Sequence, residues 1–350
     1  MKIAPIHREA SRSDRIDPLM VHTGQHYDSE MSEVFFADLS IEEPTIQLNV
    51  GSGTHAEQTA AVLVQLEPHL ERLRPAAVLV VGDVNSTLAA ALCAAKLNIP
   101  VVHVEAGLRS FNRAMPEEVN RVMTDAISDL LLAPSDDAVE NLIREGHSSE
   151  RIHMVGNLMI DSLDSMLARS RSSDILERLD LIPGAFFLAT LHRPANVDDL
   201  GQLQHLVQML VAISGYNPVV FVVHPRTRAM LDASDQLPVL EGAGVIMLEP
   251  LGYMDFLALE AASAGVLTDS GGIQEETTVL GVPCMTLRDE TERPVTVTHG
   301  SNHIVGRDLG AILEVIEGIV SGPPPEAHRP PLWDGHSAER VVSILEERYG

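Results

Sequence analysis

The segment Leu267–Glu276, LTDSGGIQEE, combines residue types that bind phosphate groups. An apolar run ends in Asp-Ser-Gly-Gly, and a helical pattern begins directly afterwards. Glycine lets the backbone approach a ligand closely, and the free amides at a helix N-terminus attract an anion. Ser270, Gly271 and Gly272 are therefore candidate diphosphate binders, and Glu276 can accept hydrogen bonds from ribose hydroxyls. A capped helix with an acidic first turn also explains the serine and the acids, but not the paired glycines.

Three acids in the first half of the chain are candidates for proton transfer. Asp83 follows an apolar run in VGDVNST, Glu105 follows the next run in HVEAGLRS, and Glu117 opens a helix beside Glu118 after Met115-Pro116. A single acid at a strand end can simply cap the helix that follows. Two acids on adjacent strand ends favour general acid/base chemistry, because both side chains then face one site.

The basic residues at strand ends are ambiguous when taken singly. His192 and Arg193 follow an apolar run in TLHRPAN, and the HPRTR segment, 224–228, has the same placement. Arg288 and Arg293 in LRDETERP can face a diphosphate or pair with the acids beside them.

Short apolar runs alternate with helical patterns along the whole chain, which predicts parallel sheets covered by helices on both faces. The runs of the first half are PLMVHTG, followed by a helix near Ser29–Leu39, then TIQLNV, AAVLVVGD, IPVVHVEAG, DLLLAPS and RIHMVGN. The pattern restarts with FFLATLHR and continues through NPVVFVVHP, GVIMLEP, AGVLTDSGG and VPCMTLRD. We therefore predict an α/β fold with two Rossmann-like, doubly wound domains.

The domain boundaries follow from this restart. We assign residues 1–163 and 336–350 to the N-terminal domain and residues 164–335 to the C-terminal domain. The amphipathic segment His336–Arg348, which follows a proline-rich stretch, is expected to pack back onto the first domain. Ligands of such sheets bind beyond the carboxyl ends of the strands, so an interdomain cleft is the expected site.

Composition excludes several classes of partner. The 350 residues carry a formal charge of -26, which disfavours nucleic acids and anionic membranes. No run approaches the ~20 apolar residues of a membrane span, and the first residues lack the apolar core of a signal peptide, so we expect a cytoplasmic protein. Cys93 and Cys284 lie in apolar runs and are expected to be buried rather than paired. No Cys/His spacing indicates a metal site.

Taken together, these motifs resemble the non-hydrolysing UDP-N-acetylglucosamine 2-epimerases over nearly the whole chain. The segments that carry the resemblance are TGQHYD, GDVNST, HVEAGLRS, MPEEVNR, VGNLMID, HPRTR, TDSGGIQEE and RDETERP, in this order. The resemblance implies the domain arrangement of the GT-B glycosyltransferases, a homodimer, no cofactor, a UDP-sugar substrate and a role in cell-surface polysaccharide biosynthesis.

The resemblance also implies roles for individual residues. Asp83, Glu105 and Glu117 match the acid/base carboxylates, and His192 and Arg293 match a histidine near the diphosphate and a cleft arginine. The substrate-binding set is Lys2 of the opening loop, Phe256 against the uracil, and Ser270, Gly271, Gly272 and Glu276 at the UDP.

Two departures from the family pattern stand out. Family members usually begin with a hydrophobic strand and a Gly-Thr-Arg-Pro-Glu loop before the segment that corresponds to Lys2–Pro5, with which this sequence starts. This implies either a misassigned start or a sheet without that strand, and with the latter a catalytically weak protein. In addition, Ala195 stands where a glutamate usually precedes the asparagine, which is expected to alter the orientation of the histidine or the local hydrogen bonding.

The resemblance implies an isomerase that interconverts UDP-N-acetylglucosamine and UDP-N-acetylmannosamine by UDP elimination and re-addition. A GT-B glycosyltransferase, a UDP-sugar-binding protein without turnover and a hydrolysing epimerase remain as alternatives. The sequence leaves the sugar open, because relatives with an HPRTR segment act on UDP-N-acetylglucosamine or on diacetamido uronic acids.

Overall fold

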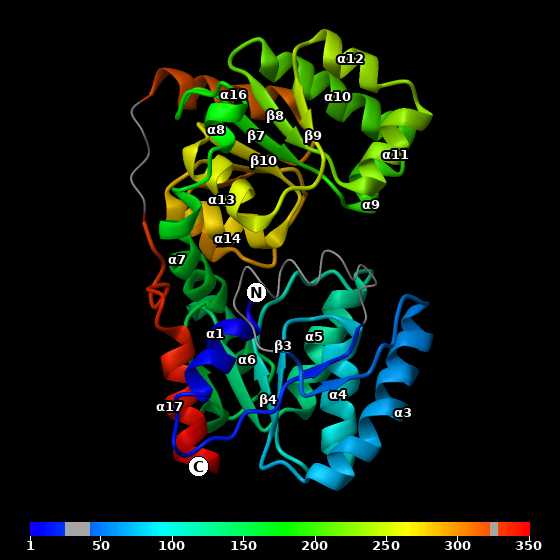
Figure 1. Ribbon diagram of the computed structural model, residues 1–350, viewed down its shortest axis with the longest axis vertical. Helices are drawn as coiled ribbons and strands as arrows, with labels where there is room; N and C mark the ends of the chain where they lie inside the picture. Colours follow the sequence, from blue (N-terminus) through cyan, green and yellow to red (C-terminus); the bar gives the residue numbers. More distant parts are fainter. Residues whose placement is uncertain (25–42, 323–327) are drawn as a thin grey trace. The chain divides into compact units, whose positions relative to one another are not determined.

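The computed structural model of the protein describes residues 1–24, 43–322 and 328–350. The chain divides into two compact units, one formed by Met1–Ser162 with Pro331–Gly350 and the other by Leu163–Pro330 (Figure 1). Both units are built on parallel sheets, which confirms the predicted α/β class with two Rossmann-like units. The helix predicted near Ser29–Leu39 lies outside the described residues, as does part of the TGQHYD segment.

The first unit contains one four-stranded parallel sheet, in the order β3-β4-β5-β6, and a separate parallel pair, β1-β2. Its strands are β1 (Val21–His22), β2 (Ile46–Gln47), β3 (Val78–Val81), β4 (Val101–Val104), β5 (Leu130–Ala133) and β6 (Ile152–Met154). Its helices are α1 (Ile3–Ala10), α3 (His55–Leu73), α4 (Asn85–Lys96), α5 (Pro116–Ile127), α6 (Asp136–Arg144) and α17 (Ser337–Tyr349), with a 3₁₀ turn, η1, at Ser149–Arg151. Helix α7 (Leu158–Ser170) begins in the first unit and ends in the second.

The C-terminal helix α17 packs onto the first unit, as the amphipathic pattern predicted. Ala338 and Val341 lie in the same buried cluster as Ile6 of α1 and the strands β4 and β5. The carboxylate of Asp161 accepts the backbone N–H of Ala338 at 2.7 Å, which satisfies an amide at the start of the helix. Trp333, just before the helix, is buried, and its indole N–H donates to the carbonyl of Pro134 at 3.0 Å.

The second unit contains a six-stranded parallel sheet in the order β12-β11-β10-β7-β8-β9. Its strands are β7 (Phe187–Thr190), β8 (Val219–Val222), β9 (Ile246–Leu248), β10 (Gly265–Thr268), β11 (Cys284–Thr286) and β12 (Asn302–Ile304). Its helices are α8 (Ile175–Arg178), α9 (Pro194–Val197), α10 (Leu200–Ser214), α11 (Pro225–Ala233), α12 (Leu237–Gly242), α13 (Tyr253–Ala262), α14 (Gly271–Leu280), α15 (Val295–Thr298) and α16 (Leu309–Ser321). The chain order reverses between β7 and β10, the switch point at which ligands bind in open α/β sheets.

Strands β7, β8, β10 and β11 are buried on both faces, which explains their largely apolar sequences. Phe187 and Ala189 of β7 lie in the cluster that contains α10 and α16, whereas Leu188 lies in the cluster that contains α8 and α13. Successive side chains of a strand point to opposite faces, so a strand covered by helices on both sides has no polar face. Cys284 of β11 is buried and unpaired, and so is Cys93 of α4, as their apolar surroundings predicted.

Candidate functional site

Glu105, directly after β4, has an uncommon backbone conformation. Its φ of 69° lies in the left-handed region, where a residue with a side chain is strained. The side chain is buried, and Oε2 accepts a hydrogen bond from Lys2 Nζ at 2.6 Å. Within the described residues, Oε1 is buried without a hydrogen-bond partner. Strain and an unsatisfied buried oxygen are features that persist at functional sites, so Glu105 is the strongest proton-transfer candidate of this unit.

A buried ionic network holds the loop that carries Glu105. Both ring nitrogens of His103 face acceptors, Nδ1 at 2.6 Å from Asp125 Oδ1 and Nε2 at 3.0 Å from the carbonyl of Gly82. Burial alone lowers the pKa of His103, but the charge of Asp125 and the hydrogen bonds outweigh it and leave that pKa above its ordinary value. Asp125 also accepts from Arg109 Nη2 at 2.6 Å and from the backbone N–H of Gly107 at 3.0 Å. The network fixes the ends of β3 and β4 relative to each other.

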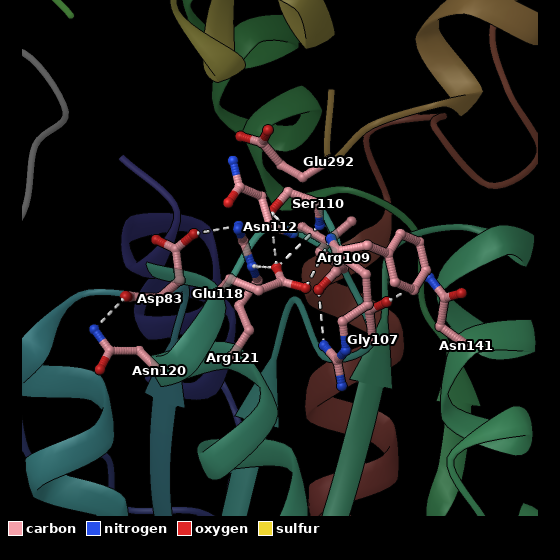
Figure 2. Close-up of polar contacts among 12 residues, drawn as sticks. Asp83, Gly107, Arg109, Ser110, Asn112, Glu118, Asn120, Arg121, Asn141 and Glu292 are labelled. Atoms are coloured by element: carbon pink, nitrogen blue, oxygen red, sulfur yellow. Dashed lines mark hydrogen bonds and ion pairs between the residues drawn. The ribbon is translucent and has the colours of Figure 1, made fainter. Parts of the chain in front are cut away.

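Asp83, after β3, is held by a second buried cation (Figure 2). Arg121 of α5 donates to Asp83 Oδ2 at 2.8 Å and to Glu118 Oε2 at 3.1 Å. Asn120 donates to the backbone carbonyl of Asp83 at 2.9 Å, and Glu118 accepts the backbone N–H of Ser110 at 2.9 Å. Each strand-end carboxylate is therefore paired with a cation, Glu105 with Lys2 and Asp83 with Arg121, which it shares with Glu118.

The acid pair on the first turn of α5 divides into one buried and one exposed residue. Glu118 is buried in the network just described, whereas Glu117, the predicted catalytic acid, is exposed to solvent. Glu118 was named above only as the neighbour of Glu117, and Arg121 was not assigned a role. The signal was present in MPEEVNR, because Glu118 and Arg121 are separated by one helical turn and face the same side.

In the second unit, His192 and Asp269 meet at the switch point of the sheet. His192 follows β7 and Asp269 follows β10, and the distance between His192 Nδ1 and Asp269 Oδ1 is 2.9 Å. Asp269 also accepts the backbone N–H of Arg193 at 2.9 Å and the side-chain amide of Asn196 at 3.0 Å. Burial raises the pKa of Asp269, but the hydrogen bonds and charge of His192, together with these other donors, leave it below its ordinary value. Asp269 therefore orients His192, a role that the sequence analysis missed although the residue lies inside its strongest motif.

The expected effect of Ala195 concerns the surroundings of His192. Ala195 is exposed on α9, while the orientation of His192 is set by Asp269 and that of the loop by Asn196, which also donates to the carbonyl of Leu287 at 3.1 Å. The expectation that the absence of a glutamate at position 195 alters the histidine or its hydrogen bonding stays a prediction.

The N-terminus of α14 carries the predicted diphosphate motif. Ser270 precedes the helix in an extended conformation, and its side chain makes no capping hydrogen bond, so simple capping does not explain this serine. A Cβ atom on Gly271 would lie only 2.6 Å from Arg293 Nη1, so a side chain at position 271 would displace the guanidinium from its place against the first turn. Gly272 follows within the same first turn. Amides and a cation thus converge where an anion is expected.

The two arginines of LRDETERP pair with acids, one of the alternatives left open above. Arg293 contacts Glu292 at 2.6 Å and Glu275 at 2.7 Å, and Arg288 contacts Glu292 at 2.8 Å. In the HPRTR segment, Arg226 pairs with Asp198 and Arg228 with Glu249, while the ring of His224 lies 5.7 Å from that of His192.

Glu276 lies on the second turn of α14 and is buried. Its Oε1 accepts the hydroxyl of Tyr253 at 2.8 Å, and burial raises the pKa of Glu276 to about 7. Phe256, which the resemblance places against the uracil, is partly buried in the cluster between α8 and α13.

Within the described residues, no three His, Cys, Asp or Glu side chains are grouped so that they could hold a metal ion. Over the same residues, no helix has both the length and the apolar character needed to cross a membrane.

Comparisons with known proteins agree over almost the whole chain. A relative from Methanocaldococcus jannaschii named UDP-N-acetylglucosamine 2-epimerase is 41% identical, over 99% of this chain and 95% of its own length. A Pseudomonas aeruginosa relative named UDP-2,3-diacetamido-2,3-dideoxy-D-glucuronate 2-epimerase is 42% identical, over 90% of this chain and 87% of its own length.

Solved structures give the same result. The crystal structure of the Methanocaldococcus jannaschii UDP-GlcNAc 2-epimerase in complex with UDP-GlcNAc and UDP has a TM-score of 0.90, with 41% identity over 99% of this chain and 96% of that chain. The Neisseria meningitidis UDP-GlcNAc 2-epimerase bound to UDP-GlcNAc also has a TM-score of 0.90, with 29% identity over 99% of this chain and 96% of that chain. The family model described as UDP-N-acetylglucosamine 2-epimerase matches residues 8–346, and the chain belongs to this family.

Proposed function

We propose that this chain interconverts UDP-N-acetylglucosamine and UDP-N-acetylmannosamine by inverting C2 of the sugar. The observation that carries the proposal is Glu105, a buried carboxylate in a strained backbone conformation with one oxygen unpartnered among the described residues. Such a group is suited to take or deliver a proton at a substrate atom. The sequences and names of the relatives support the same reaction.

The C2 hydrogen of the sugar is not acidic, so a carboxylate needs help to remove it. In the proposed reaction the C2 proton moves to a carboxylate, the electron pair of the C2–H bond forms a C1–C2 double bond, and the C1–O bond breaks with its electron pair leaving on UDP. The products of this step are UDP and a 2-acetamidoglucal. Re-addition of UDP at C1 with protonation of C2 on the other face gives the epimer. We assign the proton transfers to Asp83, Glu105 and Glu117.

In this proposal, residues of the second unit bind the nucleotide. Ser270, Gly271 and Gly272 bind the diphosphate with their amides, and His192 and Arg293 stabilise the charge that develops as UDP leaves. The carboxylate of Glu276 accepts the ribose hydroxyls. Phe256 lies against the uracil, and Lys2 completes the substrate site beside Glu105.

The test is incubation with UDP-N-acetylglucosamine in heavy water, followed by NMR of the sugar. The expected product is a mixture of both epimers with deuterium at C2, because the proton that is removed and the proton that returns exchange with solvent on different carboxylates. Epimerisation without deuterium uptake contradicts elimination and re-addition. Turnover only with an added sugar acceptor identifies a glycosyltransferase, and release of free N-acetylmannosamine identifies a hydrolysing epimerase.

The choice of sugar is part of the proposal, because one relative of similar identity is named for a diacetamido glucuronate. A side-by-side assay of the two UDP-sugars decides it, and preferential turnover of the diacetamido uronic acid contradicts our choice. We further propose that the enzyme is a cytoplasmic homodimer without a cofactor that supplies cell-surface polysaccharide synthesis.

A further inference from the structure

Two buried carboxyl groups of the second unit lie against each other beside the proposed nucleotide site. Glu260 on α13 is fully buried, and Glu276 on the neighbouring helix α14 is 3% exposed (Figure 1). Their side chains are in hydrogen-bonding contact. Tyr253 and Glu260 are seven residues apart on α13, which is two helical turns, so both project from the same face toward Glu276.

The two acids have unequal surroundings. Glu276 accepts the hydroxyl of Tyr253 at 2.8 Å, whereas neither oxygen of Glu260 accepts a hydrogen bond from a donor in the described residues. Among the residues that the structure describes, neither Glu260 nor Glu276 has an ion-pair partner. An ionised carboxylate that is buried without a donor or cation is strongly destabilised, so it keeps its proton instead.

Chemistry fixes the direction of the contact between the two acids. Two carboxylates cannot hydrogen-bond each other unless one carries a proton. Tyr253 stabilises the charged form of Glu276, whereas no donor within the described residues stabilises a charge on Glu260. In agreement, burial and the neighbouring Glu276 raise the pKa of Glu260 well above its ordinary range.

We propose that Glu260 is a positioning residue that stays protonated when Glu276 ionises and donates a hydrogen bond to the Glu276 carboxylate. A carboxylate has about four lone-pair positions. Tyr253 and Glu260 occupy two of them and fix the plane of the Glu276 carboxylate, which leaves two positions for the two hydroxyls of a ribose. The inference rests on the proposed function, because it takes Glu276 as the ribose ligand, and it adds a buried acid to the residues that determine nucleotide affinity.

The test compares Glu260→Gln with Glu260→Met. Glutamine keeps an N–H that can donate to Glu276, whereas methionine has a similar length but no donor. Isothermal titration of the full chain with UDP is carried out at pH 8, above the pKa of Glu276. The affinity is expected to stay within about threefold of wild type for Glu260→Gln and to fall by about tenfold or more for Glu260→Met, since hydrogen bonds to a charged group are worth that much. Titration with 2′,3′-dideoxy-UDP, which lacks both hydroxyls, is expected to show no difference among the three proteins.

The control nucleotide separates positioning from a general structural role. Equal losses of affinity for UDP and for dideoxy-UDP in Glu260→Met overturn the inference, and so does unchanged UDP affinity in that variant. If wild type binds UDP no better than dideoxy-UDP, Glu276 is not the ribose ligand, and the assignment of Glu276 falls together with this inference. If Glu260→Met alone loses UDP affinity, the inference stands whatever sugar the enzyme turns over.

A second measurement covers the case in which Glu260→Met does not fold. Infrared spectra of wild type and the isosteric Glu260→Gln at pH 8, where Glu276 is ionised, are expected to differ by the carbonyl stretch of one protonated carboxylic acid, present only in wild type. Absence of that band from the difference spectrum overturns the inference independently of nucleotide binding.

Discussion

Replacement of Glu105 by glutamine separates proton transfer from nucleotide binding. Glutamine keeps the size of the side chain and an oxygen that can accept a hydrogen bond from Lys2. In the wild-type protein, Lys2 Nζ lies 2.6 Å from Glu105 Oε2. It removes the charge and with it the ability to take a proton. The residue also keeps its left-handed backbone conformation, since both side chains are equally strained there.

The magnitude follows from these contacts. A general acid/base contributes about 10² to 10⁴ in rate, or about 2.7 to 5.5 kcal/mol of transition-state stabilisation at 1.36 kcal/mol per factor of ten. The side chain of Lys2 is 28% exposed, so water replaces part of the ion pair that Lys2 loses in Glu105→Gln. The stability of the first unit is therefore expected to fall by only about 1 to 2 kcal/mol. The affinity for UDP is expected to stay within a few fold, because the nucleotide residues belong to the second unit.

The assay is the rate of C2 epimerisation by NMR, combined with UDP titration calorimetry and a denaturation curve. Asp83→Asn is measured in parallel and is expected to behave in the same way, and Glu67→Gln, an exposed acid on α3, is the matched control. A folded Glu105→Gln protein that still epimerises at the wild-type rate, or that no longer binds UDP, refutes the role assigned to Glu105.

Three further perturbations have expected outcomes. Glu276→Ala is expected to weaken UDP binding by about 1.5 to 3 kcal/mol in titration calorimetry, and unchanged affinity removes Glu276 from the site. Glu276→Gln is expected to stabilise the ligand-free protein at pH 8. The folded-state pKa of Glu276, about 7, exceeds its ordinary value, so wild type loses stability as the pH rises from the ordinary pKa through the folded-state pKa. Urea midpoints of both proteins at pH 5.5 and pH 8 test this expectation. The pKa of Asp269 is depressed in the folded protein, so wild type loses stability as the pH falls below about 3.9. Asp269→Asn is expected to abolish this loss of stability at low pH and to lower the stability at pH 7 by about 2 to 4 kcal/mol. Equal urea midpoints for Asp269→Asn and wild type at pH 7 contradict the role of Asp269 in holding the loop of His192.

Sequence alone was enough for the fold class and for most of the strands. Strands that are covered on both faces must be apolar throughout, so runs such as those of β7 and β8 can be recognised without a structure. The amphipathic pattern of α17 likewise predicted its packing onto the first unit. The short strand β12, Asn302–Ile304, was missed because three residues that include Asn and His carry no such signal.

The position of the candidate residues at strand ends was also visible in the sequence, because it depends only on the order of elements along the chain. In TDSGGIQEE the glycines, the serine and Glu276 could be named from local backbone chemistry. The absence of a side chain at position 271 has a reason that lies 22 residues further on, where Arg293 supplies the guanidinium that occupies the space.

What surrounds each candidate was decided only by the tertiary structure. Arg121 reaches Asp83 across 38 residues of sequence and Lys2 reaches Glu105 across 103, and no local pattern encodes those pairs. Glu117 and Glu118 are neighbours in sequence, yet one is exposed and the other buried, because consecutive helical residues point about 100° apart and only packing determines which face is covered. The charge state of a carboxyl group depends on its burial and on the donors brought to it from other elements, so ionisation at this site is a property of the fold.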